Sequence, residues 1–255
     1  INLSKINSEI KGKNERYYSL IKLLKRTPNL PKTTNWFYTG DLIPISPYIW
    51  SYSTKNEKYI RLIPDFVFTE ENNRQGHNYS TQVNIIKTYG SVKAKTKKIG
   101  WAGNLFSHKN RLVLYNKSLE NPDLLNITHF CKHKIPEKYS FTNTYVDLKE
   151  LIKTNKYLID IEGYGYSSRL KLLLFSNRVM FIQDRPYKEY FYQWMEPYIH
   201  YIPVIRDLSN LIDQYNWAEN HPKEVETIRI NARNFSDKFL SFDFAVGHLS
   251  TQLNS

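Results

Sequence analysis

The sequence is poor in cysteine, since Cys131 is the only one among 255 residues. A single cysteine excludes an intramolecular disulfide and a zinc site built from several cysteines, and this indicates a reducing compartment. The sequence also lacks any apolar run near the roughly 18 residues that a membrane-spanning helix needs. Its first residues lack the charged segment followed by an apolar segment that marks a signal peptide. We therefore expect a cytoplasmic protein.

The sequence does not have the low hydrophobic and low aromatic content that is typical of a disordered chain. Hydrophobic residues make up 41% of the sequence and aromatic residues 15%, including 20 Tyr and 13 Phe. Such a composition is typical of a globular protein. A length of 255 residues allows one large domain or two domains of roughly 100–150 residues each.

The net charge of +12 is concentrated in the first half of the chain. Residues 1–110 contain 18 Lys and Arg against 7 Asp and Glu, whereas residues 111–255 contain 18 against 17. A basic half can face nucleic acid, an anionic membrane surface or a phosphate-bearing substrate, or it can be an ordinary soluble surface. The lysine cluster at 93–98 directly precedes an apolar strand, so we interpret it as a solvated connector and expect no nucleic-acid partner.

Apolar periodicity predicts an α/β fold. From Lys98 onward, short apolar runs alternate with helical patterns, which indicates a parallel sheet with right-handed crossovers. We predict two Rossmann-like domains, residues 1–95 and 96–255, with a terminal helix that can cross back to the first domain. The expected strands are residues 34–38, 59–63, 66–68, 99–101, 125–130, 157–161, 179–182 and 200–204. The expected helices are residues 15–26, 82–89, 110–119, 147–154, 167–175, 187–195, 208–215 and 222–240.

Two glycine-containing loops follow predicted strands of the second half. Ligands of open parallel sheets bind outside the carboxyl ends of the strands, where helix N-termini offer free N–H groups. The first loop runs from Gly163 to Arg169 and combines glycines, two serines that can cap a helix, and an arginine that can bind phosphate. The second contains Gly103 and leads to Arg111. Taken alone, the first loop fits a glycine-rich turn with an N-cap and an exposed arginine better than a phosphate site, and the second loop is weaker evidence still.

Other chemistries fit the sequence less well. Asp160 and Glu162 imitate the acidic pair that holds a divalent cation, but Asp160 lies within an apolar strand. His129 and His133 have helical spacing in a strand-to-loop context, which spoils zinc geometry. His200 lies in a strand that looks buried, where a structural histidine is more common than a catalytic one. We expect no metal site.

Several segments occur together in a specific order along the second half. In these segments the chain resembles glycosyltransferase family 90, which includes protein O-glucosyltransferases, fungal capsule xylosyltransferases and LpsA-type lipopolysaccharide glycosyltransferases. The resemblance extends from about Leu30 to Phe239. It rests on Tyr157–Gly163, Ser167-Ser168-Arg169, Glu189-Tyr-Phe191, Pro197–Val204 and Asp207–Leu211.

The resemblance implies a GT-B-like fold, in which two Rossmann-like domains with parallel sheets enclose a cleft. It also implies inverting sugar transfer that requires no metal and no cofactor, from a nucleotide sugar, usually a UDP-sugar. The catalytic base would be Asp41, which follows Leu30-Pro31 and a predicted strand. Acceptor-side residues of the N-terminal domain would be Trp36 and Glu70. Donor-binding residues of the C-terminal domain would be Gly103, Arg111, Gly163, Ser167, Ser168, Arg169, Glu189, His200 and Tyr201.

The chain departs from the family in two places. An aromatic Trp-Thr-Phe-Trp-Glu-Gly-Gly stretch of animal members is reduced to residues 66–70, and their cysteine-rich N-terminal region is absent. Both differences argue against a folded epidermal-growth-factor-like acceptor. We expect the acceptor to be lipopolysaccharide or another surface glycan, anionic or lipid-linked. We also expect the protein to make peripheral contact with the inner face of a membrane. The alternative is a non-catalytic carbohydrate- or polyanion-binding protein with a degenerate transferase fold.

Overall fold

The computed structural model describes residues 15–31, 35–40, 48–55, 61–72, 76–131 and 143–255. The chain divides into two compact units. Unit 1 comprises Ile1–Gln82, Pro186–Trp194 and Lys238–Ser255, and unit 2 comprises Val83–Arg185 and Met195–Asp237. The division therefore falls at Gln82–Val83 rather than at the predicted 95–96, and the first unit also takes two segments from the second half of the chain.

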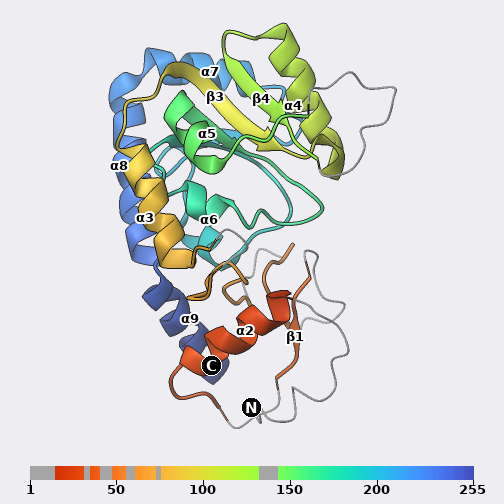
Figure 1. Cartoon of the computed structure of the whole chain (residues 1–255), viewed down its shortest axis with the longest axis vertical. Helices are drawn as coiled ribbons and strands as arrows, with labels where there is room; N and C mark the ends of the chain where they lie inside the picture. Colours follow the sequence, from red (N-terminus) through yellow and green to blue (C-terminus); the bar gives the residue numbers. More distant parts are fainter. Residues whose placement is uncertain (1–14, 32–34, 41–47, 56–60, 73–75, 132–142) are drawn as a thin grey trace. The chain divides into compact units, whose positions relative to one another are not determined.

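Unit 2 is built on a five-stranded parallel sheet with the strand order β4-β3-β5-β6-β7. Figure 1 shows β3 and β4 side by side, with α4 against β4. The predicted α/β class with parallel strands is confirmed. The strands are β3 (Thr96–Gly103), β4 (Leu125–His129), β5 (Asn155–Asp160), β6 (Val179–Gln183) and β7 (Ile202–Val204).

The helices of the described part of the chain match most of the predicted helical segments. None of them is both long and apolar enough to cross a membrane. The α-helices are α2 (Glu15–Arg26), α3 (Tyr79–Gly90), α4 (Lys109–Glu120), α5 (Leu148–Thr154), α6 (Leu170–Leu173), α7 (Leu211–Asn220), α8 (Pro222–Phe239) and α9 (Phe242–Asn254). Two 3₁₀ segments are η1 (Leu105–Ser107) and η2 (Tyr190–Trp194).

The core of unit 2 explains why these segments become strands. All five residues of β6 are buried, and its Val179 and Phe181 form one apolar cluster with side chains of β3 and β5. Strands buried on both faces need continuous apolar runs rich in β-branched and aromatic residues, as in Val179-Met-Phe-Ile182. Leu114 of α4 and Ile228 of α8 close the same cluster.

The strand order creates a topological switch point between β3 and β5. The chain leaves β3 toward β4 on one side, and it later returns to β5 on the other side. Loops that leave two such strands diverge, and the space outside their carboxyl ends is the usual ligand site of an open parallel sheet. We call this region, formed by the loops after Gly103 and after Asp160, the switch-point edge.

The described residues of unit 1 carry much less sheet. β1 (Phe37–Tyr38) pairs in parallel with β2 (Trp50–Ser51), and Leu62 forms an isolated parallel bridge to Ser51. The described part of unit 1 therefore contains a short parallel sheet rather than the full Rossmann-like sheet expected for residues 1–95.

The lysine cluster interpreted as a connector is the beginning of a strand, since β3 starts at Thr96. Lys95 forms an ion pair with Glu150 at 2.7 Å, and the ammonium group of Lys98 donates to the carbonyl oxygen of Pro122 at 2.6 Å. Lys97 lies 3.5 Å from Glu219. These lysines thus have acceptors within unit 2.

An aromatic cluster in unit 1 surrounds a histidine of α9. The His248 ring stacks on Tyr190 with 4.7 Å between ring centroids and also contacts Trp194 and Phe244. Burial lowers the pKa of His248 to about 4, although a hydrogen bond to the backbone of Leu62 acts in the opposite direction. The imidazole is therefore neutral in the folded protein at neutral pH.

This burial predicts a pH-dependent stability. Between pH values of about 6.5 and 4 the unfolded chain protonates His248 while the folded chain does not, so acidification favours unfolding. We expect His248 to remove up to about 3 kcal/mol from the free energy of unfolding over that range. Denaturant titrations at several pH values should show a smaller loss in His248→Gln than in wild type, with His221→Gln as the matched control. Identical pH profiles for wild type and His248→Gln would contradict this prediction.

Candidate functional site

The switch-point edge begins with two capped turns after β3. The Asn104 side chain accepts a hydrogen bond from the backbone N–H of Phe106 and starts η1. His108 then caps α4, because its Nδ1 accepts from the backbone N–H of Asn110 at 3.2 Å. Nδ1 of His108 is therefore unprotonated. These caps fix the direction in which α4 leaves the edge and place Arg111 in its first turn.

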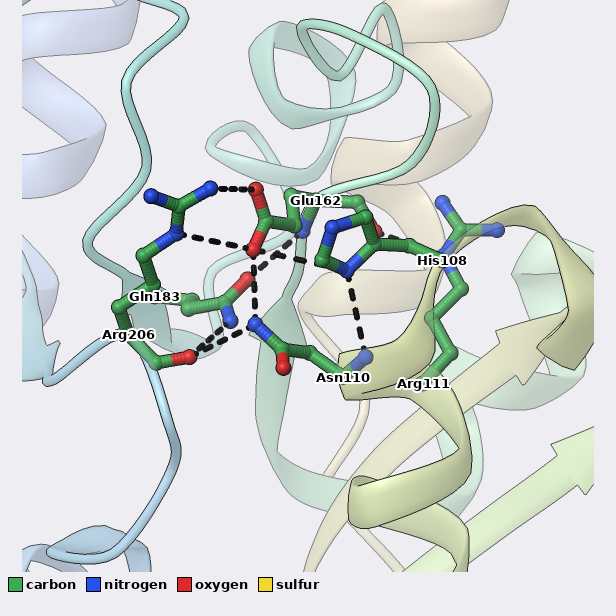
Figure 2. A network of polar contacts seen from close by, with 6 residues as sticks. All are labelled: His108, Asn110, Arg111, Glu162, Gln183 and Arg206. Atoms are coloured by element: carbon green, nitrogen blue, oxygen red, sulfur yellow. Dashed lines mark hydrogen bonds and ion pairs between the residues drawn. The ribbon is translucent and has the colours of Figure 1, made fainter.

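Arg111 joins the carboxyl ends of the two central strands. Its Nε donates to the carbonyl oxygen of Glu162 after β5, and its Nη1 donates to the carbonyl oxygen of Asn104 after β3, both at 2.9 Å. Figure 2 shows Arg111 beside Glu162 at the start of α4. One guanidinium group thus connects both loops of the switch-point edge.

Arg169 reaches the same place from the loop after β5. Its Nη1 donates to the carbonyl oxygen of Ala102 at 2.6 Å. Both guanidinium groups lie close to the ring of Trp101 in β3, with distances from Cζ to the ring centroid of 5.2 Å for Arg111 and 5.7 Å for Arg169. The structure therefore brings together the two arginines that the sequence predicted for the donor site.

The two arginines form a concentration of positive charge. Burial and the charge of Arg169 lower the pKa of Arg111 to about 10, and burial lowers the pKa of Arg169. Both remain protonated at neutral pH. In the described part of the chain they donate to backbone carbonyls, while the nearby carboxylate of Asp160 accepts from Arg185 at 2.5 Å and from Ser167 at 2.7 Å. Such a pair is suited to bind an anion with several oxygens.

The glycines of both loops make room for protein side chains. A Cβ at Gly103 would lie 2.9 Å from Cζ2 of Trp101, and a Cβ at Gly163 would lie 2.8 Å from Nη2 of Arg111. Real Cβ atoms do not approach other atoms this closely, so a larger residue would displace the indole or the guanidinium. From the sequence we predicted that these glycines leave space for a ligand. In the structure they also leave space for the Trp101 ring and the Arg111 guanidinium.

The helix predicted from Ser167 is one turn long and starts later. α6 spans Leu170–Leu173, and Arg169 precedes it without capping it through its side chain. The predicted N-cap is wrong because the Ser167 hydroxyl donates to the carboxylate of Asp160. The carbonyl oxygen of Ser168 accepts from the ammonium group of Lys171 at 3.1 Å. These contacts fix the loop that presents Arg169.

A second polar network lies at the carboxyl ends of β5, β6 and β7 (Figure 2). The Glu162 carboxylate, only 2% exposed, accepts from Nδ2 of Asn110 at 2.7 Å and lies 3.4 Å from Nη2 of Arg206. Gln183 accepts from the backbone N–H of Glu162 at 2.8 Å and donates to the carbonyl oxygen of Arg206 at 2.6 Å. The network ties the start of α4 to three strand ends.

Three members of this network were not predicted from the sequence: Asn110, Gln183 and Arg206. Each had a signal in the sequence. Gln183 directly follows the apolar run 179–182, Arg206 directly follows the run 202–205, and Asn110 lies two residues after the cap of α4. A polar residue at the carboxyl end of a buried parallel strand points to the ligand edge of the sheet.

The acidic pair considered as a metal site is engaged in these contacts. Asp160 pairs with Arg185 inside the core, and Glu162 accepts from Asn110. Among the described residues, no three His, Cys, Asp or Glu side chains form a group that could hold a metal ion. Nδ1 of His129 accepts from the backbone N–H of Leu105 at 3.3 Å, which supports its structural interpretation, and His133 lies outside the described residues.

Three predicted donor residues are not part of the arginine arrangement at the switch-point edge of unit 2. His200 and Tyr201 precede β7, so they lie at its amino end, whereas Arg111 and Arg169 gather at the carboxyl ends of the parallel strands. Nδ1 of His200 accepts from the backbone N–H of Glu196 at 3.0 Å, and its ring packs on Phe235. Glu189 belongs to unit 1, where it is buried next to η2.

The predicted acceptor-side residues fall in unit 1. Trp36 precedes β1 with 71% of its surface exposed, and its carbonyl oxygen accepts from the N–H of Trp50. The carboxylate of Glu70 forms an exposed ion pair with Arg26 at 2.7 Å, which the sequence did not predict. Asp41, the predicted base, lies outside the described residues and stays a prediction.

Comparisons with known proteins agree on a family. Residues 21–254 match the model of glycosyl transferase family 90. Protein O-glucosyltransferase 2 of Danio rerio is 33% identical over 152 residues, which cover 58% of this chain and 30% of that protein. Protein O-glucosyltransferase 3 of Homo sapiens is 32% identical over 124 residues, which cover 48% and 24%. The match thus spans less than one third of these relatives.

Solved structures with a similar arrangement have little sequence identity. The crystal structure of TarM gives a TM-score of 0.49 at 9% identity and covers 82% of this chain and 51% of that chain. Anabaena Alr3699/HepE in complex with UDP gives 0.42 at 8% identity, with 67% and 44% covered.

Proposed function

Because the chain belongs to glycosyl transferase family 90, we propose that it transfers a hexose or pentose from a nucleotide sugar to a hydroxyl group of a glycan acceptor. The observation that carries this proposal is the pair of protonated arginines at the switch-point edge, which donate to neutral carbonyls. The diphosphate of a nucleotide sugar is an anion with several oxygens, and guanidinium groups bind phosphate oxygens in a planar, charge-assisted fork.

The donor we propose is a UDP-sugar bound by unit 2. UDP is the usual nucleotide of the family that the sequence resembles, and the names of the relatives favour glucose as the sugar. Arg111 and Arg169 would bind the diphosphate. Gly103 leaves space for the Trp101 ring, and Gly163 leaves space for the Arg111 guanidinium. No cofactor or metal is part of this proposal.

The proposed reaction is a single displacement that inverts the configuration of the sugar. The carboxylate of Asp41 removes the proton of the acceptor hydroxyl, whose oxygen attacks the anomeric carbon. The bond from that carbon to the diphosphate oxygen breaks on the opposite face, and the nucleoside diphosphate leaves with the bonding electrons. An aspartate at its reference pKa near 3.9 is ionised at neutral pH, which is the form that this step requires. Arg111 and Arg169 stabilise the negative charge that develops on the leaving group.

The acceptor we propose is lipopolysaccharide or another surface glycan, anionic or lipid-linked. The support comes from charge, since residues 1–110 contain 18 Lys and Arg against 7 Asp and Glu. A basic half concentrates an anionic acceptor near its surface. The corresponding location is cytoplasmic, with peripheral contact at the inner face of a membrane.

Salt should affect the two substrates differently if the acceptor is anionic. The Debye length shrinks severalfold between about 0.05 and 0.5 M salt, which weakens long-range attraction between exposed charges. We expect the apparent KM for the acceptor to rise severalfold over this span, and the KM for the donor to change less because its phosphates contact partly buried arginines. Parallel responses of both KM values, or a neutral glycan as the best acceptor, would refute the anionic acceptor and leave the transferase proposal standing.

The experiment that tests the proposed function needs no acceptor. The protein is incubated with UDP-glucose, UDP-galactose or UDP-xylose in the presence of a metal chelator, and free UDP is measured over time. A transferase should hydrolyse its donor slowly, because water can replace the acceptor hydroxyl. Binding of a nucleotide sugar without any release of UDP would favour the non-catalytic carbohydrate- or polyanion-binding alternative. A strict requirement for a divalent cation would overturn the metal-independent mechanism.

A further inference from the structure

We propose that Trp101 is a positioning residue that holds Arg111 and Arg169 as a fixed pair for a diphosphate group. The diphosphate as the ligand rests on the proposed function, whereas the pairing itself rests on geometry within unit 2. The two arginines come from separate parts of the chain, since Arg111 lies in α4 and Arg169 lies in the loop after β5. One indole ring contacts both guanidinium groups.

Trp101 is anchored more firmly than either arginine. It lies near the carboxyl end of β3 with 0% of its surface exposed, and it belongs to the apolar core of unit 2. Gly103 leaves the space that the six-membered part of the ring occupies. A side chain fixed in this way provides a rigid platform, because core side chains are close-packed and rarely change rotamer.

The contacts of the two guanidinium groups show why a platform is needed. Two like charges repel each other, and the charge of Arg169 contributes to the lowered pKa of Arg111. The hydrogen bonds in the described part of the chain fix each group to carbonyl oxygens, which carry no formal charge. An aromatic ring attracts cations through its quadrupole and favours both groups without neutralising them. The Asp160 carboxylate also attracts both groups, but its ion pair is with Arg185, so the hydrogen-bond acceptors of the two arginines are neutral carbonyls that an anion can supplement.

The choice of tryptophan supports this role. Its indole Nε1 is buried, and no group in the described part of the chain accepts a hydrogen bond from it. A buried N–H without an acceptor costs stability, and a phenylalanine would fill an apolar core without that cost. Among aromatic rings the indole binds cations most strongly. The two guanidinium contacts of the ring are the interactions that favour an indole at this position.

A preformed pair lowers the cost of binding an anion. Free arginine side chains lose rotamer freedom when they become ordered on a ligand, and this loss reduces affinity. Arg111 is held by two hydrogen bonds and the indole, and Gly163 leaves room for its Nη2. When Trp101 is replaced, we expect both guanidinium groups to become less ordered and the affinity for a diphosphate to fall.

A double-mutant cycle on UDP affinity tests the proposal. Titration calorimetry compares Trp101→Phe in the wild-type background with the same change in an Arg111→Lys, Arg169→Lys background. We expect the change to weaken UDP binding about tenfold in the wild type, and less than about threefold where the guanidinium groups are absent. Trp217→Phe, which removes a partly buried tryptophan elsewhere in unit 2, is the matched control and should leave UDP affinity unchanged.

The outcomes separate this proposal from the proposed function. Equal losses in both backgrounds, or no loss at all, would overturn the positioning role of Trp101 while UDP binding itself stands. Inorganic pyrophosphate serves as a second probe: if the wild type binds pyrophosphate but not UDP, the proposed function fails and the cycle is run on pyrophosphate. Binding of neither probe would overturn both proposals. Trp101→Tyr, which also keeps an aromatic ring, replaces Trp101→Phe if the latter does not fold.

Discussion

Replacement of Asp41 by asparagine is expected to reduce sugar transfer by about 10²–10⁴-fold, the usual contribution of a general base. The amide keeps the size of the side chain but cannot accept the proton of the acceptor hydroxyl. The affinity for UDP should stay nearly unchanged, because the donor is assigned to unit 2. Initial rates with a saturating acceptor and calorimetric titration with UDP measure the two quantities.

Asp123→Asn is the control for this substitution, since Asp123 is an exposed residue in the turn before β4. It should leave both transfer and UDP affinity at the wild-type level. Full transfer activity in Asp41→Asn would remove Asp41 from the mechanism, and a large loss of UDP affinity would place it with the donor instead.

Replacement of Arg169 by lysine is expected to weaken UDP binding by about 10–100-fold. Lysine keeps the positive charge but loses the planar fork, and with it the hydrogen bond to Ala102 that orients the group. It also loses the favourable stacking of a guanidinium on the Trp101 ring. Titration calorimetry with UDP measures the change.

Arg233→Lys provides the matched control on an exposed position of α8. An unchanged UDP affinity in this control would show that a loss in Arg169→Lys belongs to the switch-point edge. Equal affinities of wild type and Arg169→Lys would exclude Arg169 from the donor site.

The fold of unit 2 could be predicted because its sequence signals are local. The apolar run 179–182 falls within the observed β6, and the run 157–161 overlaps β5 over all but its last residue. Buried parallel strands need such runs, and the polar residues that follow them mark the carboxyl ends. The two arginines of the candidate site were found for the same reason.

Unit 1 was harder to predict because its pairing depends on distant segments. Its sheet residues are two short strands and a bridge, which leave little periodicity in the sequence. Residues 186–194 and 238–255 join it through tertiary contacts, such as the packing of Tyr190 against Phe68 and the hydrogen bond that the Tyr79 hydroxyl donates to the carbonyl oxygen of Leu240. The ion pair of Glu70 with Arg26 joins residues 44 positions apart, and no local pattern indicates it.

For the two glycine loops, the location was predicted from the sequence but the function of the glycines was predicted only in part. Spacing indicated that Gly103 and Gly163 lie at the ligand edge, and it left a plain turn as the alternative. The structure shows that each glycine accommodates a neighbouring side chain, Trp101 or Arg111. Ser167 was assigned as a cap, but its hydroxyl is bound by Asp160, whose position in the core also depends on Arg185. Which partner the Ser167 hydroxyl binds depends on contacts between distant segments, which the local sequence does not reveal.

The central claim is that the switch-point edge of unit 2 binds the diphosphate of a nucleotide sugar, and hydrogen–deuterium exchange with and without UDP tests it most directly. The loops after β3 and β5, residues 103–108 and 161–169, should exchange more slowly when UDP is bound. The amino ends of the same strands should exchange at unchanged rates. Protection at the amino ends of the strands, or saturating UDP binding without protection of either loop, would contradict the claim.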